Sequence, residues 1–244
     1  MARLVDQDFI RLRAFLNEYA LTDVLQSKTR EQLIKRGHKH CLAALQVWAI
    51  AGHLTRSGQL TFQQILLKEA TPQFEQISET FSDVTSSFFT AIHGLYKPAH
   101  MLLRSAIETF IRGMSGLFSG EAATTTSVYR LFELARDCEI FSGSAAPHFQ
   151  VLHQQYVQLC EFTHSATPAH MAKNHALSSF PKQDIETLRI WVRHQESVIK
   201  AMLAIFVFSN RLLYLNATPL AQDVYEEVVP RDARLFALGA RTTT

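Results

Sequence analysis

The chain has 244 residues, of which 47% are hydrophobic and 19% are charged, and its formal net charge at pH 7 is +2. This composition excludes a disordered chain and is sufficient for one large domain with its own core. It neither requires nor excludes a nucleic-acid partner, because such a site needs clustered charge rather than a net excess.

Hydrophobic residues recur every three to four positions along most of the sequence, which predicts helices and leaves no segment with the alternation of a strand. In the N-terminal part we expect helices over residues 6–19, 29–56 and 61–70. Thr29 with Gln32 and Thr61 with Gln64 have the spacing of capping boxes, which satisfy the first backbone N–H groups of a helix. Gly58 follows the second of these helices and favours its end there.

Further helices are predicted downstream, over residues 72–92, 98–118, 128–141, 147–164 and 182–215. Pro72 and Pro98 suit the first turn of a helix, and the polar run before Val128 offers an N-cap. We expect residues 165–179 to form a loop, and the tail to be a short helix broken by Pro230.

The predicted helix over residues 182–215 contains neither Gly nor Pro and would span roughly 50 Å. Its stretch from Met202 to Phe208 is apolar on nearly every side, which is typical of a central helix or of a subunit interface. With the low charged fraction, this favours a homodimer. We therefore predict an all-α, multi-helix bundle with one long C-terminal central helix, divided into an N-terminal helical region (1–71), a bundle core (72–216) and a C-terminal short helix and tail (217–244).

Common catalytic and targeting signatures do not occur in the sequence. It has no Gly-rich phosphate loop, no Gly-x-Ser-x-Gly elbow and no His-Glu-x-x-His pair. Cys41, Cys138 and Cys160 form no Cys-x-x-Cys pair, so neither disulfides nor structural zinc is expected. Charged residues near the N-terminus argue against a signal peptide, and the longest apolar run is far shorter than the ~20 residues of a membrane span. We expect a cytoplasmic protein without membrane contact, cofactor or bound metal.

The densest positive charge lies between Lys28 and His40 and includes Lys35, Arg36 and Lys39. One interpretation is a solvated helix face, which is the commoner role of such a run. The other is a patch that contacts phosphate through these three side chains. Residues 52–66 are a possible helix-turn-helix, but it would lack a basic recognition helix, because Thr61 to Leu67 contains no Arg or Lys.

Arg104 and Glu108 stand one helical turn apart in an otherwise apolar segment. Buried charges need partners, and His164 ends a similarly apolar helix, so we expect Arg104, Glu108 and His164 to meet in a buried polar cluster. The cluster would anchor the helices or form a site. If Arg104 and Glu108 are paired, removing the carboxylate would cost about 3–5 kcal/mol.

Arg189 and His194 form an Arg-x4-His motif. RNA cleavage without a metal needs a proton carrier that titrates near neutrality, which His supplies, and a fixed cation on the phosphate, which Arg supplies. Residues five apart on a helix point about 140° apart, so a second helix would have to complete such a site. Arg193, one turn from Arg189, is a candidate for a further phosphate contact.

Two stretches together are similar to a known family. The first is Gly94-Leu95-Tyr96-Lys97-Pro98-Ala99, which leads into Leu103-Arg104-Ser105-Ala106-Ile107-Glu108, and the second is Tyr156-Val157-Gln158-Leu159-Cys160-Glu161-Phe162-Thr163-His164-Ser165. The region from Ser82 to Tyr214 resembles the bacterial HEPN-like helical proteins, which include groups found beside mobile elements and defence genes. The resemblance implies a dimeric helical bundle and, in active members, a metal-independent ribonuclease that uses Arg-x4-6-His, here Arg189 and His194. Many members have lost catalysis and serve as binding modules.

Three functions remain open on this basis. The first is a protein-binding or regulatory module of a bacterial defence or toxin-type system, with a partner encoded in the same operon. The second is a ribonuclease in which the 2′-hydroxyl of RNA attacks the adjacent phosphate, with His194 as general acid or base and Arg189 on the phosphate. The third is a nucleic-acid-binding regulator that uses the basic segment from Lys28 to His40, with RNA as a candidate partner.

Overall fold

The computed structural model describes residues 3–18, 25, 27–164 and 184–239. Within these ranges the regular secondary structure is helical apart from one short hairpin, so the predicted all-α class is confirmed. The elements, in chain order, are α1 (Leu4–Glu18), α2 (Lys28–Arg56), β1 (Thr61–Phe62), β2 (Ile65–Leu66), α3 (Pro72–Ile92), α4 (Tyr96–Gly116), α5 (Gly120–Thr124), α6 (Val128–Arg136), η2 (Glu139–Phe141), η3 (Gly143–Ala145), α7 (Ala146–His164), α8 (Ile185–Ser209), α9 (Leu212–Leu215), α10 (Pro219–Val228) and α11 (Arg231–Ala237). The loop predicted over 165–179 lies outside the described residues.

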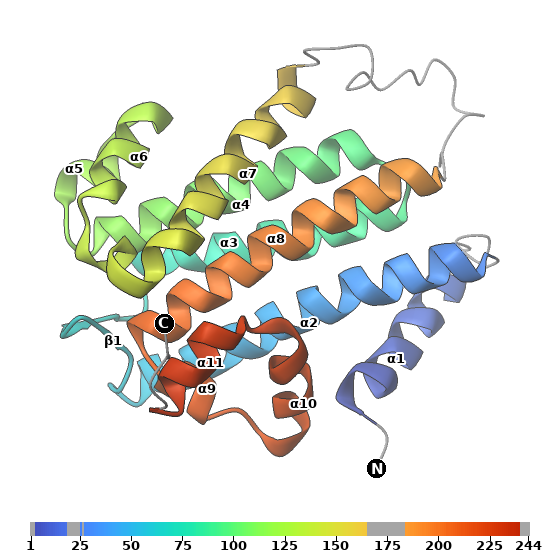
Figure 1. Cartoon of the computed structure of the whole chain (residues 1–244), viewed down its shortest axis with the longest axis horizontal. Coiled ribbons are helices and arrows are strands. Elements are labelled where there is room, and N and C mark those ends of the chain that lie inside the picture. The colour runs from blue at the N-terminus through green and yellow to red at the C-terminus, as the bar shows by residue number, and fades with distance from the viewer. Residues whose placement is uncertain (1–2, 19–24, 26, 165–183, 240–244) are drawn as a thin grey trace.

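Helix α8 occupies the centre of the bundle, as its apolar sequence predicts. It packs against α2, α4, α7 and α11, and α3 and α4 form the most extensive helix pair of the fold (Figure 1). The side chains from Met202 to Val207 are all buried. These residues suggested a homodimer, but helices of the same chain cover them. Their apolar character therefore does not require a second subunit, and dimerisation stays a prediction.

The helix predicted over residues 182–215 is interrupted, which corrects the sequence-based boundary. α8 ends at Ser209, and Asn210 has an extended backbone with φ −154°. The Asn210 side chain donates from Nδ2 to the carbonyl oxygen of Thr61 (2.9 Å) and accepts from the backbone N–H of Leu212 (2.9 Å). Asparagine competes in this way for backbone groups that a continuous helix would use, and α9 starts two residues later.

Residues 61–70, predicted as a helix, instead begin with a two-stranded antiparallel hairpin that pairs Thr61 with Leu66 and Phe62 with Ile65. The two turn residues have φ values of 48° and 72°, as a type I′ turn requires. Phe62 is fully buried and stacks on Phe206 with ring centroids 5.9 Å apart. The predicted capping box fails because its second residue, Gln64, lies in the turn.

Several predicted helix starts are confirmed within a residue or two. Thr71 caps α3, because its side chain accepts from the backbone N–H of Phe74 (3.3 Å), and Ser127 caps α6 by accepting from that of Arg130 (3.3 Å). The start of α2 is close to the prediction, but the capping box predicted at Thr29 is wrong, because the helix begins at Lys28 with Ser27 at its N-cap. The helix predicted over 128–141 divides into α6 and the 3-10 turn η2.

The three segments expected from the sequence (1–71, 72–216 and 217–244) share one hydrophobic core. α2 packs on α8, and α10 packs on α2, so residues from all three segments contribute to the same buried cluster. In the described part of the chain, none of the helices combines the length and the apolar character that crossing a membrane requires.

Candidate functional site

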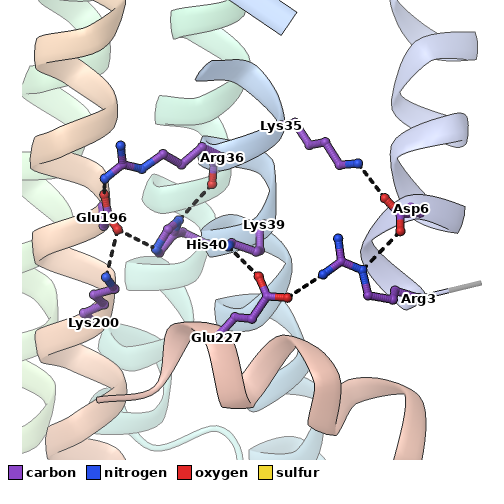
Figure 2. A network of polar contacts seen from close by, with 9 residues as sticks. All are labelled: Arg3, Asp6, Lys35, Arg36, Lys39, His40, Glu196, Lys200 and Glu227. Atoms are coloured by element: carbon purple, nitrogen blue, oxygen red, sulfur yellow. Dashed lines mark hydrogen bonds and ion pairs between the residues drawn. The ribbon is translucent and has the colours of Figure 1, made fainter. Parts of the chain in front are cut away.

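Three basic residues of α2, Lys35, Arg36 and Lys39, lie in ion pairs with carboxylates from other helices. Lys35 lies 2.5 Å from Asp6 of α1, Arg36 pairs with Glu196 of α8, and Lys39 lies 2.7 Å from Glu227 of α10. Figure 2 shows these contacts, with α2 between the three helices that supply the acids.

These pairs weaken the prediction that Lys35, Arg36 and Lys39 contact phosphate. Each cation already faces an internal anion, so a phosphate would have to compete with it. The cluster therefore acts as an electrostatic connection between helices, and phosphate contact stays a prediction.

Glu196 is the centre of this network and is largely shielded, since its side chain is 15% exposed. Besides Arg36 it contacts Lys200 (2.8 Å), and its carboxylate lies 3.4 Å from Nε2 of His40 without aligned hydrogen-bond geometry. His40 is held in place because Nδ1 donates to the backbone carbonyl of Arg36 (2.8 Å). The imidazole of His40, followed by the Lys200 ammonium, holds the pKa of Glu196 well below its usual range.

A second, more exposed part of the network ties α1 to α10. Arg3 lies 2.7 Å from Glu227 and 3.3 Å from Asp6. Lys35 chiefly lowers the pKa of Asp6, and Lys39 chiefly lowers that of Glu227. Because these side chains are about as exposed as ordinary surface ion pairs, each contact contributes only about 0.2–1 kcal/mol.

Arg189 and His194 do not meet in a shared site. Arg189 binds Glu186 on the outer side of α8 through contacts of 2.5 and 2.6 Å. His194 turns toward α7, where Nδ1 lies 2.7 Å from Oε1 of Gln155. Burial lowers the pKa of the His194 imidazole, which favours its neutral form at pH 7. Arg193, the predicted additional phosphate contact, is exposed.

The expected cluster of Arg104, Glu108 and His164 is divided in the structure. Glu108 pairs with Arg112 (3.1 Å) rather than with Arg104. A Glu that precedes its basic partner by four residues has the more favourable orientation along a helix, and Arg112 meets this condition whereas Arg104 precedes the acid. His164 is exposed at the end of α7.

Arg104 instead binds two side chains of α7. Its Nη2 donates to the hydroxyl oxygen of Tyr156 (2.6 Å), its Nε donates to Sγ of Cys160 (3.2 Å), and its guanidinium lies 4.8 Å from the centre of the Tyr156 ring. Burial raises the pKa of Tyr156 to about 12. The tyrosine hydroxyl therefore stays protonated at neutral pH and retains a hydrogen to donate.

A pocket of about 360 Å³ lies between α4, α6 and α7 at this point. Its lining residues are Arg104, Val128, Tyr129, Phe132, Glu133, Arg136, His153, Tyr156, Val157, Cys160 and His164. Its lining contains two arginines, Arg104 and Arg136, and one carboxylate, Glu133, which gives the pocket a positive character. Its rim is apolar in part, since Tyr129 is 77% exposed and Val157 is 53% exposed.

Sequence reasoning found two members of this pocket, Arg104 and His164, and missed the rest of its polar wall. The available signal was helical spacing along α7, because residues 153, 156, 160 and 164 recur every three or four positions and so share one face. The contribution of α6, including Arg136, depends on how that helix packs against α4 and α7. No local sequence pattern predicts this packing.

Neither a metal site nor a known relative helps to define the pocket. Among the described residues, no three His, Cys, Asp or Glu side chains are grouped as metal ligands. Comparison of the chain with protein-family models, with curated proteins and with solved structures finds no match.

Proposed function

We propose that this chain is a HEPN-like, non-catalytic binding module that regulates a bacterial defence or toxin-type system, and that the pocket between α4, α6 and α7 receives its protein partner. The observation that supports the proposal most is the combination of cationic and aromatic side chains there. Arg and Tyr are enriched at protein interfaces and dominate their binding energy. A partner that places a carboxylate beside an apolar side chain would match the pocket.

The pocket could orient such a carboxylate from two sides. Arg104 is held in one geometry by Tyr156 and Cys160, so little side-chain entropy is lost when it binds. Arg136 is exposed on the α6 wall, and among the described residues no ion pair neutralises it. Tyr129 and Val157 at the rim would cover the apolar part of the partner.

The placement of Arg189 and His194 favours binding over RNA cleavage. A cleavage site needs the arginine free to hold a phosphate and the imidazole within reach of the reacting oxygen. Here Glu186 occupies the arginine, and the histidine is packed against Gln155. We therefore expect purified protein to leave total RNA intact in EDTA. Cleavage in EDTA that disappears in His194→Ala would replace this proposal with the ribonuclease.

The partner can be sought by co-expressing the chain with the products of neighbouring genes of the same operon and measuring the affinity of any complex. Arg104→Gln and Arg136→Gln should each weaken the complex by about tenfold. Arg193→Gln removes the same charge from an exposed position on α8 and should leave the affinity unchanged. Equal affinity for all four proteins would contradict the proposed pocket, and a gel shift with RNA that depends on Arg104 would favour an RNA-binding role.

A further inference from the structure

Helix α1 lies at the edge of the bundle, where it packs against α2 and α10 (Figure 1). Within the described part of the chain, the ion pairs that connect this segment to the two helices are Arg3–Glu227, Asp6–Lys35, Asp8–His38 and Arg13–Glu31. The side chains in these pairs are 28–51% exposed, except that of His38, which is 8% exposed. Exposed pairs add little stability, so the docking of α1 depends strongly on what surrounds His38.

The imidazole of His38 is enclosed between α1 and α3. Its ring centroid lies 5.6 Å from that of Phe9 in α1 and 6.0 Å from that of Phe88 in α3. Nε2 lies 3.0 Å from Oδ2 of Asp8, and Nδ1 is buried with no hydrogen-bond partner among the described residues. This site suits a neutral ring whose Nε2–H donates to the carboxylate. Protonation would place a second N–H on Nδ1, where no acceptor faces it, and a buried donor without an acceptor is costly.

The charges around His38 come from two helices and act in opposite directions. Asp8 of α1 favours the protonated ring, Lys35 of α2 opposes it, and the contact from α3 is the uncharged ring of Phe88. Burial outweighs the carboxylate and lowers the pKa of His38. When α1 is undocked, water replaces Phe9, and the imidazole titrates near its ordinary value of 6.5. The undocked chain therefore takes up the proton first as the pH falls, which weakens docking below a pH of about 6.5.

We propose that α1 is a releasable arm, which undocks from α2 and α10 in mildly acidic solution when His38 takes up a proton. Release uncovers the apolar face of α1, which includes the buried residues Val5 and Phe9, and the surface of α2 around His38. Histidine protonation at an interface is a known basis of pH sensing. The arm shares no residue with the pocket between α4, α6 and α7, and α1 lies across the bundle from α6 (Figure 1). The switch is therefore independent of the proposed function.

Hydrogen exchange of the native protein measures the docking of α1, because local opening exposes backbone amides to exchange. The exchange is followed by mass spectrometry at pH 7, 6 and 5 and corrected for the intrinsic rate at each pH. We expect the protection of residues 4–18 to fall by about tenfold or more from pH 7 to pH 5, because uptake of one proton shifts the equilibrium by up to tenfold per pH unit. The amides of α8 should stay protected. Constant protection of α1, or its loss only together with that of α8, would overturn the proposal.

Three variants identify the group that responds, and protection of α8 reports that each is folded. His38→Gln keeps an N–H for Asp8 but cannot gain a charge, so the response of α1 between pH 7 and pH 5 should disappear. His53→Gln removes an exposed histidine near the end of the same helix and should respond as the parent does. Asp8→Asn should reduce the protection of α1 at pH 7 but keep the response, because His38 remains. A full response in folded His38→Gln, or its loss in Asp8→Asn, would assign the effect to other groups and contradict the proposal.

Discussion

Replacing Glu196 with glutamine tests the electrostatic connection between α2 and α8. The substitution keeps the shape of the side chain and removes its charge, so Arg36, Lys200 and His40 lose their common anion. Hydrogen bonds to charged groups contribute about 1.5–3 kcal/mol each, but two of these partners are substantially exposed, at 50% and 38%, and screening reduces their share. We expect Glu196→Gln to lower the free energy of unfolding at pH 7 by about 2 kcal/mol in total.

The effect has a defined pH dependence. The pKa of Glu196 in the folded protein lies below the value of 4.5 for an unperturbed glutamate, so the unfolded chain takes up the proton first as the pH falls. The stability that the carboxylate contributes is therefore fully present above the unfolded value and is lost as the pH falls below 4.5 toward the folded pKa. The difference between parent and variant should be constant near neutrality and should narrow in acid.

Urea unfolding followed by circular dichroism at a series of pH values measures this difference. In thermal unfolding at neutral pH, a loss of about 2 kcal/mol should lower the melting temperature of Glu196→Gln by about 4–8 °C, given the scaling for chains of this size. Glu186→Gln is a matched control on the same helix, because its side chain is 72% exposed and bound to Arg189, and it should change stability by less than about 0.5 kcal/mol. Equal stability of the parent and Glu196→Gln at pH 7, or a gap that widens in acid, would refute the reasoning.

Two further substitutions test individual contacts by urea unfolding. Glu108→Ala should cost about 1–3 kcal/mol, because it leaves the partly buried Arg112 without its anion. Double-mutant cycles should show coupling of Glu108 to Arg112 and little coupling to Arg104, and the reverse result would restore the pair expected from the sequence. Gly37→Ala should cost about 1–3 kcal/mol, because a Cβ there would lie 2.9 Å from Oε1 of the buried Gln195. An unchanged midpoint would mean that this amide moves aside freely.

The sequence predicts those parts of the fold that depend on neighbouring residues. Helical spacing locates the major helices, and Pro72 and the polar run before Val128 mark two of their starts. The hairpin after α2 depends instead on distant contacts, because Phe62 packs on Phe206 and Asn210 binds the carbonyl of Thr61. These contacts both favour the turn and end α8, and no pattern within either segment encodes them.

For the candidate site, too, the sequence reveals only what a local pattern shows. Arg104 stands out because an apolar helix seldom retains an arginine, so its importance is visible in the sequence. Its partners are not, since Tyr156 and Cys160 face it only after α7 packs on α4. For the same reason the sequence identifies the cations of α2 as a cluster but gives no sign that acids from three other helices meet them.

The pairing of α2 with α8 has a consequence for the newly made chain on the ribosome. Arg36 and Glu196 are separated by 160 positions, which take about 10–30 s to synthesise at 5–20 residues per second. During that interval α2, which buries apolar residues such as Leu33, Ile34 and Val47 in the finished protein, lacks its packing contact with α8. We expect nascent chains halted before α8 to bind chaperones and to aggregate when released. Chains that include α8 should neither bind chaperones nor aggregate.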